Sequence, residues 1–226
     1  MKYLIVVAHP DDEVLGAGAS IYKWTRNGDK VDVCILCASA NARAFRPESK
    51  ELESDMNSAV KSIGVARVYE GNFPNIEMNV VPHIQLVQFI EKAIFESEPD
   101  IVITHHPADL NNDHQQTSSA CQEAIRLAQR RPNDLKQLRE VWYMEIPSCT
   151  EWGINSSQKS FTPNCFVEVG LDAVHAKIRA LSLYRGVMRP YPHPRSDEFI
   201  IGLAAYRGGQ FYLNYAEAFE VVLRKY

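Results

Sequence analysis

The chain has 226 residues, of which 46% are hydrophobic and 23% are charged, a composition typical of a globular protein. This length suits one domain with a full core, so we expect a single domain over residues 1–226. A formal net charge of −4 argues against nucleic acid as a partner, because nucleic-acid-binding proteins usually present a basic surface. No apolar run reaches the roughly 18 residues of a membrane span, and the first residues lack the cleavage region of a signal peptide. We therefore expect a cytoplasmic enzyme or binding protein without a nucleic-acid or membrane partner.

The first half of the chain alternates apolar runs with helical patterns. The expected strands cover residues 3–8, 31–38, 67–69 and 100–104, and the expected helices cover residues 12–27, 48–63, 80–96 and 114–130. Gly28 and Gly64 follow two of these helices and are expected to end them. The alternation predicts an α/β fold with a Rossmann-like, doubly wound and mostly parallel sheet that has helices on both faces. No G-x-G-x-x-G motif follows the first strand, so a dinucleotide is not indicated.

The alternation is less regular in the second half of the chain. Strands are expected at residues 139–146, 166–169 and 219–223, and helices at residues 171–185 and 196–207. Arg207 and Glu217 are expected to form a structural ion pair beneath the C-terminal segment.

The five cysteines follow no disulfide framework. Their number is odd, which suits a reducing compartment. Cys34 and Cys37 form a C-x-x-C pattern within an expected strand, where positions three apart face opposite sides. We therefore expect both to be core residues rather than a redox or metal pair.

Two polar clusters stand where expected strands end. The sequence HPDDE occupies residues 9–13, after the first strand, and HHPADLNNDH occupies residues 105–114, after the strand at 100–104. Active sites of open α/β sheets form beyond the carboxyl ends of the strands. A catalytic zinc takes three protein ligands from His and Asp or Glu and keeps one position for water. His9, Asp12 and His114 provide such a set.

These residues also have structural explanations. Two aspartates at the start of a helix often only cap it or interact with its dipole, but the preceding His-Pro and the second cluster favour a metal site. Asp113 with Gln116 fits a capping box, a role that is compatible with orienting His114. His105 and His106 are expected to support the site or to pack in its loops rather than to bind the ion.

The stretches AHPDDE (8–13), DH (113–114) and the C-terminal HPRS, RGG and YAEAF resemble the zinc-dependent PIG-L/LmbE-like N-deacetylases. The likeness extends over most of the chain. It implies the doubly wound fold, zinc ligands at His9, Asp12 and His114, and Asp11 as the general base. It also implies removal of an acetyl group from a small-molecule substrate, an N-acetylated sugar or sugar conjugate.

The residue types suit this reaction. Zinc lowers the pKa of its bound water to about 7 and polarises the amide carbonyl. Asp11, next to the ligand Asp12, can take the proton of that water. Glu13 would then support the site or face the helix surface. Sites built from His and Asp also accept other divalent ions.

One position departs from the family pattern. Many members carry a histidine three residues before the last ligand, where this chain has Asn111. Asparagine can donate a hydrogen bond to substrate but cannot deliver a proton, so we expect the general acid at His193 in YPHPRS. The alternative for His193 is an exposed loop residue. By resemblance, Arg46 in the loop after the second strand contacts substrate, and the alternative is a solvated arginine.

We expect a zinc-dependent N-deacetylase acting on an N-acetylated amino sugar. One alternative is a zinc amidase that cleaves a larger acyl group from a thiol–sugar conjugate. Another is a carbohydrate-binding protein that keeps the metal without turnover. The presence of Asp11 argues against the latter, because a non-catalytic site needs no second carboxylate beside the ligand. The sequence leaves open which sugar is the substrate and whether the chain forms a homo-oligomer.

Overall fold

The computed structural model describes residues 1–37, 48–128, 138–154 and 159–226. These residues form seven strands: β1 Lys2–Val7, β2 Lys30–Ile35, β3 Arg67–Glu70, β4 Ile101–His105, β5 Glu140–Met144, β6 Cys165–Glu168 and β7 Ala216–Arg224. They make one sheet in the order β3-β2-β1-β4-β5-β7-β6. Strands β1 to β5 pair in parallel, whereas β7 runs antiparallel to both β5 and β6. The predicted mostly parallel sheet is confirmed.

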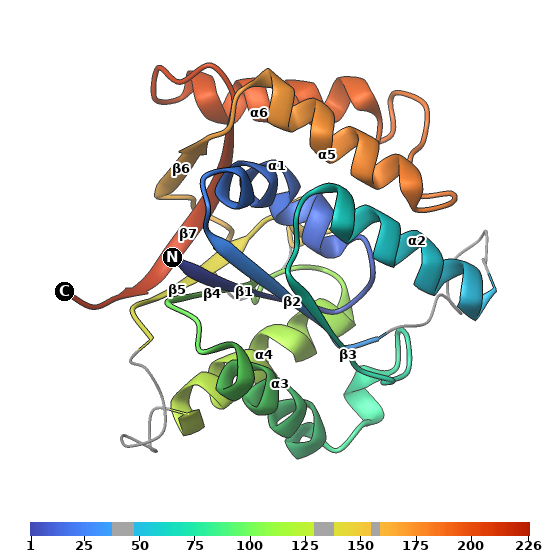
Figure 1. The fold of residues 1–226 in the computed structure, drawn as a ribbon, viewed down its shortest axis with the longest axis vertical. Coiled ribbons are helices and arrows are strands. Elements are labelled where there is room, and N and C mark those ends of the chain that lie inside the picture. Colours follow the sequence, from blue (N-terminus) through green and yellow to red (C-terminus); the bar gives the residue numbers. More distant parts are fainter. Residues whose placement is uncertain (38–47, 129–137, 155–158) are drawn as a thin grey trace.

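Helices cover both faces of this sheet (Figure 1). They are α1 Asp12–Arg26, α2 Ser49–Ser62, α3 His83–Ser97, α4 Asn112–Ala128, α5 Leu171–Leu183 and α6 Asp197–Gly209. Helices α3 and α4 lie on one face, and α1, α2, α5 and α6 lie on the other (Figure 1). The doubly wound arrangement is therefore confirmed. None of the helices in the described ranges is long and apolar enough to cross a membrane.

The order of the strands reverses between β1 and β4. From β1 the chain proceeds outward to β2 and β3, and then returns to β4 on the other side of β1. In such sheets the crevice at the carboxyl ends of the two strands at the reversal point receives the ligand. Both polar clusters follow these two strands, so the topology brings them to one place.

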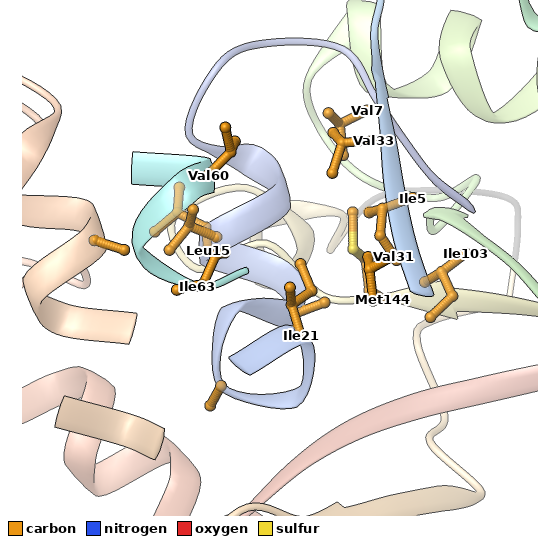
Figure 2. Close-up of a cluster of buried hydrophobic side chains, with 14 of the residues drawn as sticks. Ile5, Val7, Leu15, Ile21, Val31, Val33, Val60, Ile63, Ile103 and Met144 are labelled. Carbon is orange, nitrogen blue, oxygen red and sulfur yellow. The ribbon is translucent and has the colours of Figure 1, made fainter. Parts of the chain in front are cut away.

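Apolar side chains of the strands fill two cores. Ile5 and Val7 of β1 face α1 and α2, whereas Leu4 and Val6 face α3 and α4. Figure 2 shows the first core, where strand residues pack against Leu15, Ile21, Val60 and Ile63. Because successive residues of a strand point to opposite faces, burial on both sides requires continuous apolar runs. This explains the pattern in the sequence.

Cys34 and Cys37 belong to the second core. Both side chains are buried, and neither forms a disulfide. The expectation that they are core residues is confirmed, but the expectation that they face opposite sides is wrong, because β2 ends at Ile35 and Cys37 lies beyond it.

The predicted ends of two helices are confirmed, and the predicted start of α3 is wrong. Gly28 and Gly64 each have φ of +86°, a conformation that glycine adopts without steric cost. Helix α3 begins at His83 rather than at residue 80, because Pro82 lacks the N–H group that a helix interior requires. The residues before it form a short 3₁₀ turn, Met78–Val80.

The ion pair expected between Arg207 and Glu217 is wrong. Arg207 instead makes two hydrogen bonds to Glu145, of 2.8 and 2.6 Å. Glu217 pairs with Lys177 at 2.7 Å. Both of these residues are buried, and Glu217 also accepts hydrogen bonds from the backbone N–H groups of Ala19 and Ser20 in α1. The C-terminal strand is thereby attached to the helix that begins at Asp12.

Candidate functional site

Three side chains converge beyond the carboxyl ends of β1 and β4. His9 follows β1, Asp12 is the first residue of α1, and His114 lies in the first turn of α4. Nδ1 of His9 lies 3.3 Å from Oδ2 of Asp12, and Nε2 of His114 lies 3.2 Å from the same oxygen. Potential ligand atoms of all three residues lie within 4.8 Å of one another. The structure thus brings together the three residues expected to bind a metal.

The spacing of these atoms fits a divalent ion. Ligand atoms of a tetrahedral zinc site, with bonds of about 2.0–2.1 Å, are about 3.3 Å apart. Nitrogen and carboxylate oxygen are also the atom types that zinc binds in catalytic sites. The distances from Asp12 to both imidazoles match this value.

The opposite nitrogen of each imidazole faces another carboxylate. Nε2 of His9 lies 2.9 Å from Oδ2 of Asp113, and Nδ1 of His114 lies 3.1 Å from Oδ2 of Asp109. Such a carboxylate holds the proton on the far nitrogen and leaves the near nitrogen to bind a metal. The His9 ring is therefore oriented for ligation by a hydrogen bond, and the His114 ring by the nearby charge of Asp109.

Asp113 has a different position from the one expected. It does not cap α4, because Oδ1 of Asn111 accepts the hydrogen bond from the Asp113 N–H group. The Asp113 carboxylate instead accepts hydrogen bonds from the backbone of Ile76 and Met78 and contacts His9. It supports His9, whereas Asp109 supports His114. The role of Asp109 was not anticipated from the sequence.

A second trio, His105, Asp109 and His114, also lies within 4.8 Å, but it suits a metal less well. Nε2 of His105 already accepts a hydrogen bond from the backbone of Ala8 at 2.9 Å. Asp109 accepts hydrogen bonds from Thr150 and from the backbone of Asn111. Burial and the nearby His114 lower the pKa of His105 to about 3, so this ring is neutral. His105 supports the loop, as expected.

The charges in the cluster are strongly coupled. Burial lowers the pKa of His9, but hydrogen bonds with Asp113 and Asp12 outweigh it and raise that pKa to about 10. Burial also lowers the pKa of His114, but Asp12 and Asp109 outweigh it and raise that pKa to about 9. The pKa of Asp12 is lowered despite burial, mainly by His114. Since imidazole must be neutral to bind a metal, we expect a metal to displace protons from this cluster.

Asp11 occupies a strained turn between β1 and α1. Its φ of +105° is rare for a residue with a side chain, and such strain is concentrated at functional sites. Its N–H group donates to Glu13 at 3.1 Å, and Glu13 in turn accepts a hydrogen bond of 2.6 Å from Tyr184. Glu13 is completely buried, and burial raises its pKa to about 8. Glu13 therefore supports the turn and does not face the helix surface.

The carboxylate of Asp11 contacts Arg195. Nη1 of Arg195 lies 3.3 Å from Oδ2 of Asp11, and its Nε donates to Ser148 at 3.3 Å. Burial lowers the pKa of Arg195, but Asp11 and Asp12 outweigh it and raise the pKa, so the guanidinium is charged. Arg195 belongs to HPRS, a stretch that carries the family resemblance. That motif is the signal in the sequence that could have indicated Arg195. The sequence analysis instead selected His193 of the same motif, as the general acid.

His193 lies two residues before Arg195 in the same loop. Its ring is exposed, and its Nδ1 accepts a hydrogen bond from the Arg195 N–H group at 3.0 Å. Partial burial and the charges of Arg195 and Arg189 lower its pKa. Arg46, the expected substrate contact, lies outside the described residues.

A cavity of about 220 Å³ lies beside this cluster. One of its walls is Thr150, which donates a hydrogen bond of 2.8 Å to Asp109. Its other walls carry carboxylates, a hydroxyl, an aromatic ring and the Arg207–Glu145 pair; they include Glu151, Ser160 and Phe161. A ligand in this cavity would lie next to Thr150, the hydrogen-bond partner of Asp109.

The metal-type cluster, the strained turn and the fold together agree with a known family. The model described as GlcNAc-PI de-N-acetylase, PIG-L, matches residues 4–125, more than half of the chain. The protein therefore belongs to the PIG-L family, and the resemblance seen in the sequence is confirmed.

Solved structures share the fold over the whole chain. A conserved protein of Thermus thermophilus is 22% identical, with a TM-score of 0.77 and coverage of 99% of this chain and 96% of that chain. The 4-carboxy-2-hydroxymuconate hydratase GalB of Pseudomonas putida is 21% identical, with a TM-score of 0.80 and coverage of 100% and 98%. The N,N′-diacetylchitobiose deacetylase of Pyrococcus horikoshii is 18% identical, with a TM-score of 0.76 and coverage of 98% and 84%. At these identities the similarity concerns the fold.

Proposed function

We propose that the protein is a metal-dependent N-deacetylase that hydrolyses the acetamide of an N-acetylated amino sugar or sugar conjugate, with zinc as its ion. The observation that carries this proposal is the convergence of His9, Asp12 and His114 with Asp11 beside them. Membership of the PIG-L family supports it. So does the similarity to the P. horikoshii deacetylase.

The residues of the site divide the work. Nδ1 of His9, the Asp12 carboxylate and Nε2 of His114 would hold the ion, which when bound supplies a polarised carbonyl and an acidified water. Asp11 takes the proton of the attacking water, and its turn is held by Glu13 and Tyr184. Oδ1 of Asn111 caps α4 by accepting the hydrogen bond from the Asp113 N–H group. The NH2 group of the same side chain is therefore our candidate for a substrate contact.

Two groups are candidates to protonate the leaving amine. His193 is the first, but its lowered pKa reduces the fraction of the ring that is protonated at neutral pH. Asp11, after taking a proton from water, is the second. The structure favours Asp11 on this physical ground.

The adjoining cavity supports a sugar as the substrate. Its walls offer hydroxyl and carboxylate groups that can bond sugar hydroxyls, and an aromatic ring, Phe161, that can lie against an apolar sugar face. The only cationic wall residue among those described, Arg207, is already paired with Glu145. This lining suits a neutral sugar better than a phosphorylated one.

A panel of N-acetyl sugars, assayed for released acetate, tests the proposal. We expect about one divalent ion per chain and metal loss in His114→Ala, because the ligands hold the ion only together. Asp11→Asn should retain the metal but lose about 100-fold or more in turnover, as for a general base. Normal turnover in metal-loaded Asp11→Asn would disprove the mechanism.

The same panel separates the alternatives. Release of a larger acyl group from a thiol–sugar conjugate, without acetate release, would indicate the amidase. Sugar binding without any turnover would indicate a binding protein. GalB is named as a hydratase, so water addition to 4-carboxy-2-hydroxymuconate is a further assay, and activity there alone would replace the deacetylase proposal.

A further inference from the structure

We infer that Arg195 is a catalytic residue whose guanidinium binds the carbonyl oxygen of the scissile amide as negative charge develops on it. This inference rests on the proposed function. It concerns a residue 70 positions beyond the segment that the family model matches, residues 4–125.

The position of the guanidinium carries the inference. Nη1 of Arg195 is 3.3 Å from the carboxylate of Asp11, and Nε is 3.3 Å from Oγ of Ser148. The side chain is 22% exposed, so part of it is accessible while most of it is shielded from bulk water. Its charge acts on Asp12 as well as on Asp11. The cation thus stands at the edge of the cluster that holds the candidate metal ligands.

The role of Asp11 as general base sets the distance between the Arg195 guanidinium and the attacked carbonyl. A general base must lie about 2.6–3.2 Å from the water it deprotonates, and reacting atoms in a productive complex are about 3–3.5 Å apart. The attacked carbonyl therefore lies only a few ångströms beyond the Asp11 carboxylate, which Arg195 already contacts. The guanidinium has five N–H donors, of which the contacts to Asp11, Ser148 and Cys149 use three.

The reaction needs such a group. Oxygen of water forms a bond to the carbonyl carbon, the π electron pair moves to the carbonyl oxygen, and the water proton passes to Asp11. The electron pair on the oxyanion then re-forms the carbonyl, the C–N bond breaks with its electron pair going to nitrogen, and the amine nitrogen takes the proton held by Asp11. The products are acetic acid, which releases its proton to become acetate, and the free amine. A donor aimed at the developing oxyanion is worth about 10²–10³ in kcat, more than it contributes to binding the neutral amide.

Asn111 stands where many family members carry a histidine, so a charged donor to the oxyanion must come from another residue. Asn111 is a neutral residue whose Oδ1 accepts the hydrogen bond from the Asp113 N–H group. His193 is exposed. Arg195 supplies a permanent positive charge, because a guanidinium does not lose its proton in proteins.

Arg195 could instead act only by orienting Asp11, so the experiment must measure more than turnover. Methylphosphonate is a stable tetrahedral anion that resembles the intermediate of acetyl transfer. Its dissociation constant is measured by calorimetry on protein with metal and on protein after chelation, for the wild type, Arg195→Ala, Arg195→Lys and the control Arg189→Ala. Arg189 lies in the same loop, and its Nε bonds the backbone of Gly186.

We expect Arg195→Ala to bind methylphosphonate at least 10-fold more weakly in both forms, with Arg195→Lys in between and Arg189→Ala unchanged. With an active sugar, kcat of Arg195→Ala should fall about 100-fold while KM changes little, as for one oxyanion donor. Added guanidinium ion should restore part of this activity. Unchanged methylphosphonate affinity in folded Arg195→Ala, or in Arg195→Lys if the alanine variant does not fold, would overturn the inference.

Failure of the inference can be distinguished from failure of the proposed function. A wild type that releases acetate, with an Arg195→Ala variant of equal kcat and equal anion affinity, removes Arg195 from catalysis and leaves the deacetylase standing. A wild type that releases no acetate but binds methylphosphonate through Arg195 retains the anion site and removes the deacetylase.

Discussion

At the scale of single residues, the candidate metal site consists of three potential ligands and of the carboxylates that contact them. Asp113 contacts Nε2 of His9, and Asp109 contacts Nδ1 of His114. The other ring nitrogen of each histidine faces Asp12. Removing such a partner leaves the ligand present but less well oriented. Metal affinity is therefore the property that should respond.

We expect Asp113→Asn and Asp109→Asn to weaken metal binding by about 10- to 100-fold, the usual effect of losing a carboxylate behind a histidine ligand. Competition with a chelator of known affinity measures this. Asp55→Asn is a matched control, because Asp55 is a buried carboxylate that contacts Arg185 instead of the site. If all three variants bound the metal with equal affinity, Asp113 and Asp109 would not be the residues that orient the histidine ligands.

The hydroxyl of Tyr184 should matter for the turn that carries Asp11. Tyr184→Phe leaves the buried Glu13 carboxyl without this donor, which we expect to cost about 1–3 kcal/mol of stability and to lower turnover through Asp11. Urea unfolding and acetate release measure the two effects. Tyr212→Phe, at a fully exposed position, is the control and should change neither.

His193→Ala decides which group protonates the amine. If Asp11 returns the proton, kcat should change by less than about threefold and the alkaline limb of the pH–rate profile should remain. A loss of about 100-fold with a flattened alkaline limb would show instead that His193 is the acid. Both profiles are measured on one N-acetyl sugar.

At the scale of elements, α1 links the site to the rest of the molecule. The helix begins at Asp12, and its Gly16 packs against β5, where an added Cβ would contact Met144 and would lie 2.9 Å from Cδ1 of Ile146. Lys177 of α5 donates to the carbonyl of Leu15 at 2.6 Å. Its partner Glu217 accepts the N–H of Ala19, the residue that an α-helix pairs with that carbonyl. Helix α1 is therefore held by groups from three other elements.

Gly16→Val should destabilise the fold by about 1–3 kcal/mol, because the side chain overpacks the contact between α1 and β5. We also expect weaker metal binding, since Asp12 lies one turn away on the same helix. Gly202→Ala in α6 is the control: an added Cβ there meets nothing within 4 Å, so alanine should be neutral or stabilising by up to about 1 kcal/mol. Thermal and urea unfolding test both.

At the scale of the whole molecule, three parts of the chain meet at one edge of the sheet. The β1–α1 and β4–α4 connections supply the metal-type residues, and the C-terminal part supplies Tyr184 and Arg195. The family model covers only the first two parts. The adjoining β5 loop brings Thr150 and the cavity. The part of the chain beyond the matched residues 4–125 therefore supplies contacts to Asp11 and to the turn that carries it.

The stability of the whole molecule should depend on the protonation of His106. Its ring packs edge-on against Tyr143 and Phe161, and burial lowers its pKa although Glu220, 3.5 Å away, opposes the shift. A histidine with a lowered pKa in the folded state contributes stability above its unfolded pKa of about 6.5, and this contribution is lost as the pH falls. We expect the contribution of His106, measured as the difference in free energy of unfolding between the wild type and His106→Asn, to fall as the pH is lowered from about 7.5 to 5.5, on either side of that unfolded pKa. The raised pKa values of His9 and His114 act in the opposite sense, but they act equally in both proteins. A difference that does not change with pH would exclude His106 as the cause.

Local chemistry in the sequence determined most of the fold and the metal-type residues. Continuous apolar runs indicated the strands, and the glycines at 28 and 64 indicated the helix ends, because these depend on neighbours within a few residues. His9, Asp12 and His114 could be selected as candidates because each follows a strand, and the topology brings the ends of these strands to the same edge.

Only the tertiary structure decided which residue each of these side chains contacts. His9 meets Asp113 across 104 residues, Glu13 meets Tyr184 across 171, and Asp11 meets Arg195 across 184. Local sequence gives no information on such pairs, because they depend on the paths of loops and on how α5 and α6 pack over α1. For the same reason the sequence paired Arg207 with Glu217, whereas the packed chain places Glu145 beside Arg207 and Lys177 beside Glu217. A charged side chain that loses water on folding takes the partner that packing brings within reach, and packing is a property of the whole chain.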